Sequence, residues 1–263
     1  MVPLRPEARE HVLARLGVEE RPGLLALRHA VLFRRPGLWG DDARRPHTVV
    51  YLRPVGRRRE AFAVGRPEPA AGWLASREGE IALVAPEDWE PWIRSALGPV
   101  EPRRSEVRTW YDPPVRDPRG PSPAPVRRLT PEDKPAFLAI APEWALLGWG
   151  GFDDLIRHGA AFGVPFLDGF VSLAWVFDQS ARFDALGIFT VPRFRRLGLA
   201  RAVARSLIRL CQKERSKTPL WSAHAENFGS HALALSLGFD GPNSEMLLSW
   251  PTSSAAPEPG RMI

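Results

Sequence analysis

The second half of the chain alternates between strand-like and helix-like hydrophobic patterns. Three apolar runs separated by short polar turns come first, as is typical of consecutive strands. In the next segment, apolar residues recur every three or four positions and arginines occupy the other side, which is the pattern of an amphipathic helix. The expected strands cover residues 160–169, 170–179, 183–191, 219–226 and 245–250, and the expected helices cover 198–215 and 230–237.

The stretch before these elements completes the order. Residues 126–130 have the pattern of a short strand, and residues 130–133 (Thr-Pro-Glu-Asp) have the cap, the early proline and the acidic first turn of a helix start. This helix is predicted to reach about Ala145, ahead of a loop rich in tryptophan and glycine and a helix over 152–159. The predicted order of this half is β-α-α-β-β-β-α-β-α-β.

The first half has a mixed pattern of its own, and a proline-rich stretch separates it from the second. Prolines between residues 111 and 130 disfavour both helix and central strand, so this stretch indicates a linker. The expected helices of the first half cover 5–16, 21–33 and 87–98, and the expected strands cover 47–55, 59–66 and 106–112, with either a strand pair or a strand and loop within 71–86. We therefore predict an α+β (mixed α/β) protein with a smaller domain over 1–120, a second domain over 121–252 and a disordered tail over 253–263.

The composition is that of a folded protein of the cytoplasm. Of 263 residues, 44% are apolar and 25% are charged, and the chain has a single cysteine, which excludes an internal disulfide. We find neither an apolar run long enough to cross a membrane nor a signal segment at the N-terminus. The calculated pI is about 10.3. Because the basic surplus is thin and spread evenly, nucleic-acid binding stays an unfavoured alternative.

The junction between the expected strand 183–191 and the helix after it contains an unexpected glycine. Gly198 stands where the helix starts, although glycine costs a helix about 1 kcal/mol relative to alanine. Backbone N–H groups at such a junction are unpaired and the helix dipole adds positive charge, so bare amides around Gly198 could bind a phosphate or pyrophosphate. An ordinary strand–turn–helix with a chance glycine is the alternative.

A second motif makes the first more specific. Asn227 follows a predicted strand, Ser230 comes three residues later, and the next helix ends on Leu-Gly-Phe at 237–239. Together with Arg195-Arg196-Leu197-Gly198-Leu199-Ala200, this segment resembles the GNAT superfamily of acyl-CoA N-acyltransferases. The resemblance covers about residues 125–250. In detail, the segment is similar to a bacterial branch of the family whose members have an extra N-terminal domain. That branch includes enzymes that acetylate aminopolyol antibiotics. The role of the N-terminal domain is not identified by any motif; we expect it to wall or complete the acceptor site, and it could be a degenerate copy of the same fold.

The resemblance implies an N-acetyltransferase that moves an acetyl group directly from acetyl-CoA, its co-substrate, to an amine. The backbone of the strand before the loop would pair with the pantetheine arm, the loop amides would hold the pyrophosphate, and Ser230 would lie near the thioester sulfur. Asn227 would face the pantetheine arm, or would cap the following helix, or both. The implied cofactor-binding residues are Phe189, Thr190, Val191, Arg195, Arg196, Leu197, Gly198, Leu199, Ala200, Asn227 and Ser230.

The motifs identify the cofactor-binding residues but not the catalytic acid and base. Many family members have a tyrosine seven residues after the Asn as the acid for the thiol, and this chain has Ala234 there. The acid is then Ser230, a water or a group from the other domain. Asp184 and His224 are the candidate bases. A structural role is the alternative for each of these three side chains.

The acceptor would lie against Trp144 and Trp149. The alternative is that both tryptophans pack in the hydrophobic core. The acceptor is a small-molecule or peptide amine, with antibiotic, polyamine, amino acid and protein N-terminus all open. No metal-ligand spacing occurs among the histidines, so no metal is expected. A module that binds CoA without transferring the acyl group is the main alternative, because the tyrosine is missing.

Overall fold

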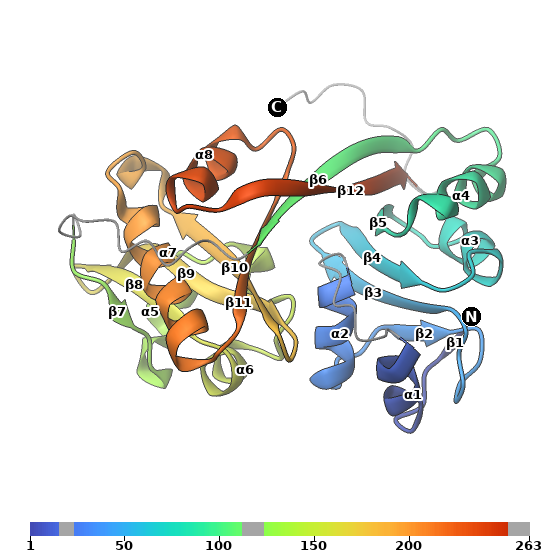
Figure 1. Cartoon of the computed structure of the whole chain (residues 1–263), viewed down its shortest axis with the longest axis horizontal. Coiled ribbons are helices and arrows are strands. Elements are labelled where there is room, and N and C mark those ends of the chain that lie inside the picture. Colours follow the sequence, from blue (N-terminus) through green and yellow to red (C-terminus); the bar gives the residue numbers. More distant parts are fainter. Residues whose placement is uncertain (16–23, 112–123, 252–263) are drawn as a thin grey trace. The chain divides into compact units, whose positions relative to one another are not determined.

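The computed structural model describes residues 1–15, 24–111 and 124–251 (Figure 1). It divides into two compact units. Unit 1 is built from residues 1–18, 36–105 and 246–263, and unit 2 from residues 19–35 and 106–245. The expected boundary near residue 120 and the tail over 253–263 lie outside the described residues. The units take their segments from both sides of that boundary.

Unit 2 is a mixed sheet with helices, and its strand order is β7-β8-β9-β10-β11-β6. Strands β8, β9 and β10 are antiparallel neighbours, β10 runs parallel to β11, and β6 pairs antiparallel with β11. The strands are β6 (Arg103–Tyr111), β7 (Arg127–Arg128), β8 (Ala161–Phe166), β9 (Gly169–Gln179), β10 (Phe183–Thr190) and β11 (Thr218–His224). The helices are α2 (Leu25–Leu32), α5 (Lys134–Leu138), α6 (Phe152–His158), α7 (Leu199–Arg209) and α8 (Phe228–Ser236).

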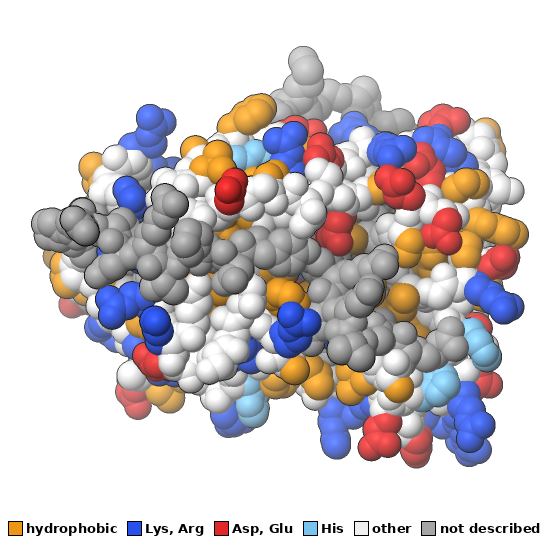
Figure 2. All heavy atoms as spheres, viewed as in Figure 1, with side chains coloured by type: hydrophobic (Ala, Val, Ile, Leu, Met, Phe, Trp, Pro, Cys, Tyr) orange, Lys and Arg blue, Asp and Glu red, His pale blue; other side chains and the backbone are white. Residues whose placement is uncertain are grey.

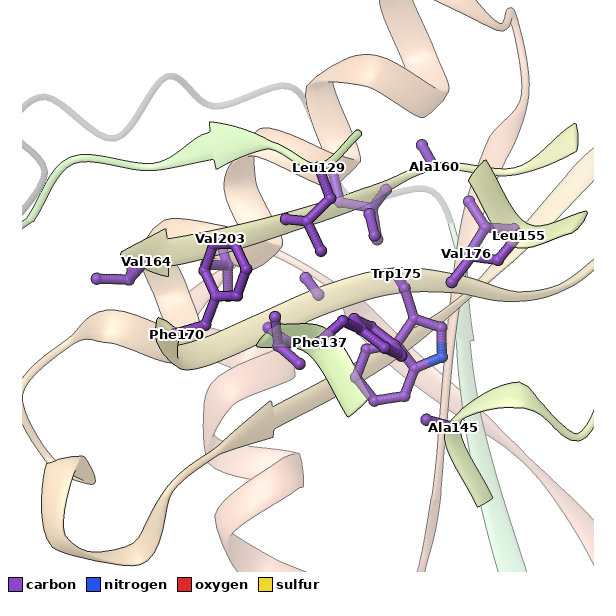
Figure 3. Close-up of a cluster of buried hydrophobic side chains, with 14 of the residues drawn as sticks. Leu129, Phe137, Ala145, Leu155, Ala160, Val164, Phe170, Trp175, Val176 and Val203 are labelled. Atoms are coloured by element: carbon purple, nitrogen blue, oxygen red, sulfur yellow. The ribbon is translucent and has the colours of Figure 1, made fainter. Parts of the chain in front are cut away.

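Long aromatic side chains fill the core of unit 2. Trp175 of β9 and Phe137 of α5 are fully buried and meet edge to face, with ring centroids 6.0 Å apart. Val203 of α7 joins the same cluster (Figure 3). This cluster anchors β8, β9 and α7, because burying such side chains is the dominant favourable term in folding.

Helix α2 comes from the first half of the sequence but is part of unit 2. The ring of His29 is 1% exposed and both of its nitrogens are bonded. Nε2 donates to the carbonyl of Gly148 at 2.7 Å, and Nδ1 accepts from the backbone N–H of Gln179 at 2.8 Å. Arg35 donates to the carbonyl of Trp149 at 2.7 Å. These bonds tie residues 29–35 to the loop before α6.

Unit 1 repeats the connectivity of unit 2. Its sheet has the order β1-β2-β3-β4-β5-β12, with β3 antiparallel to β4 and β4 parallel to β5. In each half of the chain, three strands are followed by helix, strand, helix and strand. The strands are β1 (Val2–Pro3), β2 (Leu38–Gly40), β3 (Val49–Val55), β4 (Arg58–Val64), β5 (Glu80–Val84) and residues 246–251 of β12 (Asp240–Pro251), and the helices are α1 (Ala8–Arg15), α3 (Glu68–Ala75) and α4 (Glu90–Leu97).

The α+β (mixed α/β) class and the strand order of the second half are confirmed, two predicted elements differ, and the short strands β1 and β2 were not predicted. Residues 68–75, in part expected as a strand, form α3, because Glu68 and Pro69 open it as helix N-termini favour. The helix expected to reach Ala145 ends at Leu138, and Pro142 follows before a short 3₁₀ turn. None of the described helices has the length and apolar character that crossing a lipid bilayer requires.

Candidate active site

Strands β10 and β11 form a fork in the sheet of unit 2. They pair over only three residues each, Phe183–Ala185 with Thr218–Leu220. Beyond this point β10 still pairs with β9 as far as Thr190, and β11 still pairs with β6 as far as His224. The two strands therefore present facing edges without ladder bonds between them. Such edges can bond to the amides of an extended ligand.

The pairing register decides which amides of β10 face the fork. The N–H of Val191 donates to the carbonyl of Val171, the continuation of the β9 ladder, at 3.0 Å. Because backbone groups alternate along an antiparallel strand, Phe189 also directs its N–H to β9, and Ile188 and Thr190 direct theirs to the fork. The carbonyl of Thr190 accepts from Arg195 Nε at 3.2 Å. Of the three residues expected to pair with pantetheine, only Thr190 has its N–H on the open edge.

The loop after β10 has a backbone suited to an anion. Residues 192–194 form a 3₁₀ turn, and Arg196 and Gly198 then take left-handed conformations with φ of 67° and 78°. The hydrogen bonds of the described residues include none from the backbone N–H groups of 196–201. Helix α7 begins at Leu199, so its positive end adds to these bare amides.

The charged side chains within the loop and the first turn of α7 are all basic. The side chains of Arg193, Arg196 and Arg201 are exposed, and the first turn of α7 contains no acidic residue. Both the backbone and the side chains there favour a negatively charged group. Elsewhere the charges are mixed: on the face drawn in Figure 2, basic and acidic side chains are interspersed and do not gather by sign.

The first turn of α8 lies next to β11. The side chain of Asn227 accepts from the N–H of Ser230 at 3.1 Å and so caps the helix. The hydroxyl of Ser230 accepts from the indole N–H of Trp221 at 2.9 Å. The structure thus brings Asn227 and Ser230 together as expected. It adds Trp221, which the sequence analysis did not single out, although an aromatic residue on the strand before the Asn motif was a usable signal.

The position of the missing tyrosine is part of the core. Ala234 is fully buried in a cluster with Trp110 and Trp221. The two indoles come from neighbouring strands, since Trp221 is the cross-strand partner of Trp110. Because these large rings pack beneath α8, a small residue at 234 fits the space.

Asp184 lies in the closed part of the fork and is already paired. Its carboxylate is fully buried, 2.6 Å from Arg215 Nε and 3.2 Å from Lys217 Nζ. Both carboxylate oxygens are therefore engaged by cations inside the protein and are not open to an incoming amine. Nearby Cys211 is buried, and this burial raises the pKa of its thiol well above the ordinary value, with the Asp184 charge adding to the effect.

His224 lies at the open end of β11 and is exposed. Its side chain is on the face opposite Trp221, because successive strand residues alternate. Its carbonyl accepts from the N–H of Asn227 at 2.9 Å and is 3.0 Å from Nε2 of His231. The imidazole of His224 is therefore available from solvent beside the fork.

The two tryptophans near α6 have different environments. Trp149 is 3% exposed and its indole N–H donates to the carbonyl of Val176 at 2.8 Å, so it is a core residue. Trp144 is 37% exposed and packs on Trp175, with ring centroids 5.3 Å apart. Trp175 in turn lies against Gly187 of β10, where a Cβ would come within 2.4 Å of the indole. Trp144 therefore packs on the side chain that lies against β10 at the fork.

In the part of the chain that the structure describes, no group of three or more histidine, cysteine, aspartate or glutamate side chains is arranged to hold a metal ion.

Comparison with known proteins places the chain among acetyltransferases. The model of the GNAT acetyltransferase family matches residues 144–244, which include the fork, the loop and α8. An uncharacterised N-acetyltransferase of Streptomyces virginiae, encoded in the region 5′ of mutA, is 30% identical over 189 residues, which are 71% of this chain and 78% of that protein. The finer likeness to aminopolyol-antibiotic resistance enzymes stays a prediction.

Solved structures share the fold over nearly the whole chain. A GCN5-related N-acetyltransferase-like protein from Streptococcus suis aligns with a TM-score of 0.67 at 19% identity, covering 93% of this chain and 98% of its own. A tandem GNAT protein from the clavulanic acid biosynthesis pathway aligns with a TM-score of 0.63 at 11% identity, covering 97% and 99%. The family match and the relative agree with the fork and with the loop of bare amides after β10: the chain belongs to the GNAT acetyltransferase family.

Proposed function

We propose that the protein transfers an acetyl group from acetyl-CoA directly to the amine of a small molecule or peptide. The observation that carries this proposal is the fork of β10 and β11, which pair over three residues each and then separate. An extended thioester arm can lie between the two edges, with its pyrophosphate on the bare amides of the loop after β10.

The donor-binding roles follow from the placement of each group. The N–H groups of Ile188 and Thr190 would bond the pantetheine arm from the β10 edge. The amides of residues 196–200, with the exposed arginines beside them, would hold the pyrophosphate. Asn227 caps α8 through its side-chain oxygen, so its amide nitrogen is the group that would reach the arm.

The chemistry requires a neutral amine that attacks the thioester carbonyl carbon. The C–N bond forms, the C–S bond breaks, and the thiolate leaves with the electron pair. The amine nitrogen gives up a proton, and the thiolate gains one. Ser230 is the hydroxyl that would hydrogen-bond the leaving sulfur, and His224 is the base that would take the amine proton through water. Asp184 is given no role, because it is buried and paired.

The acceptor would bind beside Trp144. Its ring is partly exposed and packs on Trp175, which lies against β10 at the fork. A partly exposed indole favours an acceptor with an apolar or cationic group next to its amine.

The proposal is tested with the full chain, acetyl-CoA and a panel of polyamines, amino acids, amine-bearing antibiotics and peptides with free N-termini. A thiol reagent would report released CoA, because the single cysteine of the protein is buried and its thiol pKa is raised. Mass spectrometry would identify the acetylated acceptor. We expect thiol release that depends on one class of amine and on the protein.

A module that binds CoA without transfer is the second candidate, favoured by the buried Ala234 in place of the family tyrosine. Saturable CoA binding with no thiol release for any amine would support this candidate and contradict the proposal. No binding of CoA at all would contradict both.

A further inference from the structure

Ser230 has a fixed hydrogen-bond donor on one side. The indole Nε1 of Trp221 lies 2.9 Å from its Oγ, and Trp221 is 3% exposed. An indole N–H can only donate, so the serine oxygen must accept this bond. The serine O–H therefore cannot point at Trp221, and its hydrogen is directed elsewhere.

The position of this pair in the fork is specific. Leu220 is the last β11 residue that pairs with β10, so Trp221 is the first residue of β11 beyond the point of separation. Its side chain packs on the side of α7 and α8 with Trp110 and Ala234. Ser230 is half-buried, and its hydroxyl lies at the indole nitrogen of this first separated residue, where we expect the inner end of an arm inserted between the strands.

The hydrogen bond from Trp221 also makes the Ser230 hydroxyl a stronger hydrogen-bond donor. A hydroxyl that accepts a hydrogen bond becomes a better donor, because each bond in a chain polarises the next. A serine has too high a pKa to give its proton away to a thiolate, so it would act as a donor to the developing negative charge. Because the amine proton leaves through water to His224, the thiolate takes its final proton from solvent.

We infer that Trp221 is a positioning residue for acyl transfer. It holds the Ser230 hydroxyl with its hydrogen toward the departing thiolate, in the place of the tyrosine hydroxyl that position 234 does not supply. This inference rests on the proposed acetyl transfer. Trp110 serves as an internal reference, because its buried indole N–H has no hydrogen-bond partner among the described residues although it packs in the same cluster.

Trp221→Phe and Trp110→Phe form a matched pair. Each removes one indole N–H from the same cluster and keeps an aromatic ring. We expect Trp221→Phe to lower kcat about fivefold and Ser230→Ala about tenfold, with KM for acetyl-CoA changed less than about twofold, as the loss of one hydrogen bond predicts. Trp110→Phe should keep kcat within about twofold, and Ser230→Thr, which retains the hydroxyl, within about threefold.

The double variant separates positioning from packing. If Trp221 acts through Ser230, Trp221→Phe adds nothing to the kcat loss of Ser230→Ala. Equal losses in the two tryptophan variants, or additive losses in the double variant, would overturn the inference. Circular dichroism and thermal unfolding would show that each variant folds.

A second measurement needs no substitution at Trp221. In the proton–nitrogen NMR spectrum of the wild-type protein, CoA with its free thiol should shift the indole resonance of Trp221 and leave that of Trp110 in place. An unshifted Trp221 resonance at saturating CoA would overturn the inference even with normal turnover. A wild-type protein with neither turnover nor CoA binding would overturn the proposed function as well.

Discussion

The two units share one connectivity but differ at the same place in it. In unit 1, β4 and β5 pair in parallel over five residues each, Arg58–Phe62 with Glu80–Val84. In unit 2, the corresponding β10 and β11 pair over three and then separate. Among the described residues, the parallel pair of unit 1 is closed by backbone hydrogen bonds, whereas the parallel pair of unit 2 opens and presents two facing edges to an extended ligand.

The turns that follow β4 and β10 also differ, in whether backbone amides and basic side chains are available to an anion. After β4, Gly65 has a φ of 96° and a Cβ there would come within 2.1 Å of the carbonyl oxygen of His47, so this glycine permits close packing within the protein. Helix α3 then opens with Glu68 and Pro69, an acidic side chain and a residue without N–H. After β10, the amides are bare and the side chains basic. The same connectivity thus leaves backbone amides available to the proposed anion in unit 2, where the strand pair opens, and not at the corresponding helix start of unit 1 that the structure describes.

Gly198→Asp is the substitution with the largest expected effect. It places a negative charge among the amides that would hold the pyrophosphate, and CoA binding should weaken at least about a hundredfold, to none detectable by calorimetry. The wild type should bind one CoA per chain, because the parallel strand pair in the described part of unit 1 is closed.

Gly98→Asp is the matched control. Gly98 also has a positive φ of 61° and has open space around it, but it ends α4 in unit 1. This variant should bind CoA normally. Two CoA molecules per wild-type chain, or unchanged binding by Gly198→Asp, would contradict the comparison.

His29→Ala should destabilise unit 2 and leave unit 1 unaffected. It removes a buried ring with two bonded nitrogens and leaves the Gly148 carbonyl and the Gln179 N–H without these partners, which costs about 2–4 kcal/mol. Urea unfolding followed by hydrogen exchange should show β8 and β9 exposed earlier than β3 and β4.

For comparison, the exposed His47 in unit 1 can be replaced by alanine with a much smaller effect. Equal losses of stability for the two histidine variants would show that residues 29–35 are not an integral part of unit 2.

Arg196→Glu should raise the dissociation constant of CoA about tenfold at low salt, because it reverses a charge beside the loop amides. Arg209→Glu reverses an exposed charge in the last turn of α7, far from the loop along the helix. This variant should change the dissociation constant of CoA less than about twofold. A titration at rising salt should reduce the difference between the two variants. A salt-independent difference would argue against a charge effect.

The smallest expected effect concerns acid stability. The Arg127 guanidinium, which donates to the carboxylate of Asp133 at 2.7 Å, holds the pKa of that carboxyl below its ordinary value. Because the folded-state pKa is the lower one, this stabilisation is present above the unfolded pKa of about 4 and is lost as pH falls through the folded value.

Asp133→Asn should therefore lower stability at pH 7 by about 0.5–1 kcal/mol and have less effect below about pH 3. Urea midpoints of both proteins across this range would measure the effect. A difference that grows in acid would have the wrong sign.

The local elements of unit 2 were predictable because each depends on nearby residues. The strand and helix periods over 160–250, the glycine before α7 and the Asn227 cap could all be identified in the sequence. The role of Ala234 and the placement of Asp184 could not. The space at 234 is filled by Trp110 from a strand of the other half, and Asp184 is neutralised by Arg215 and Lys217 after the helix that follows.

The sequence by itself thus determined the order of elements, the loop around Gly198 and the family motifs, because periodicity, capping and backbone freedom act over a few residues. Only the tertiary structure decided that β10 and β11 separate, that α2 belongs to unit 2 and that Trp221 holds Ser230. Strand pairing and side-chain packing join residues far apart in the chain, and no local pattern specifies which partners meet.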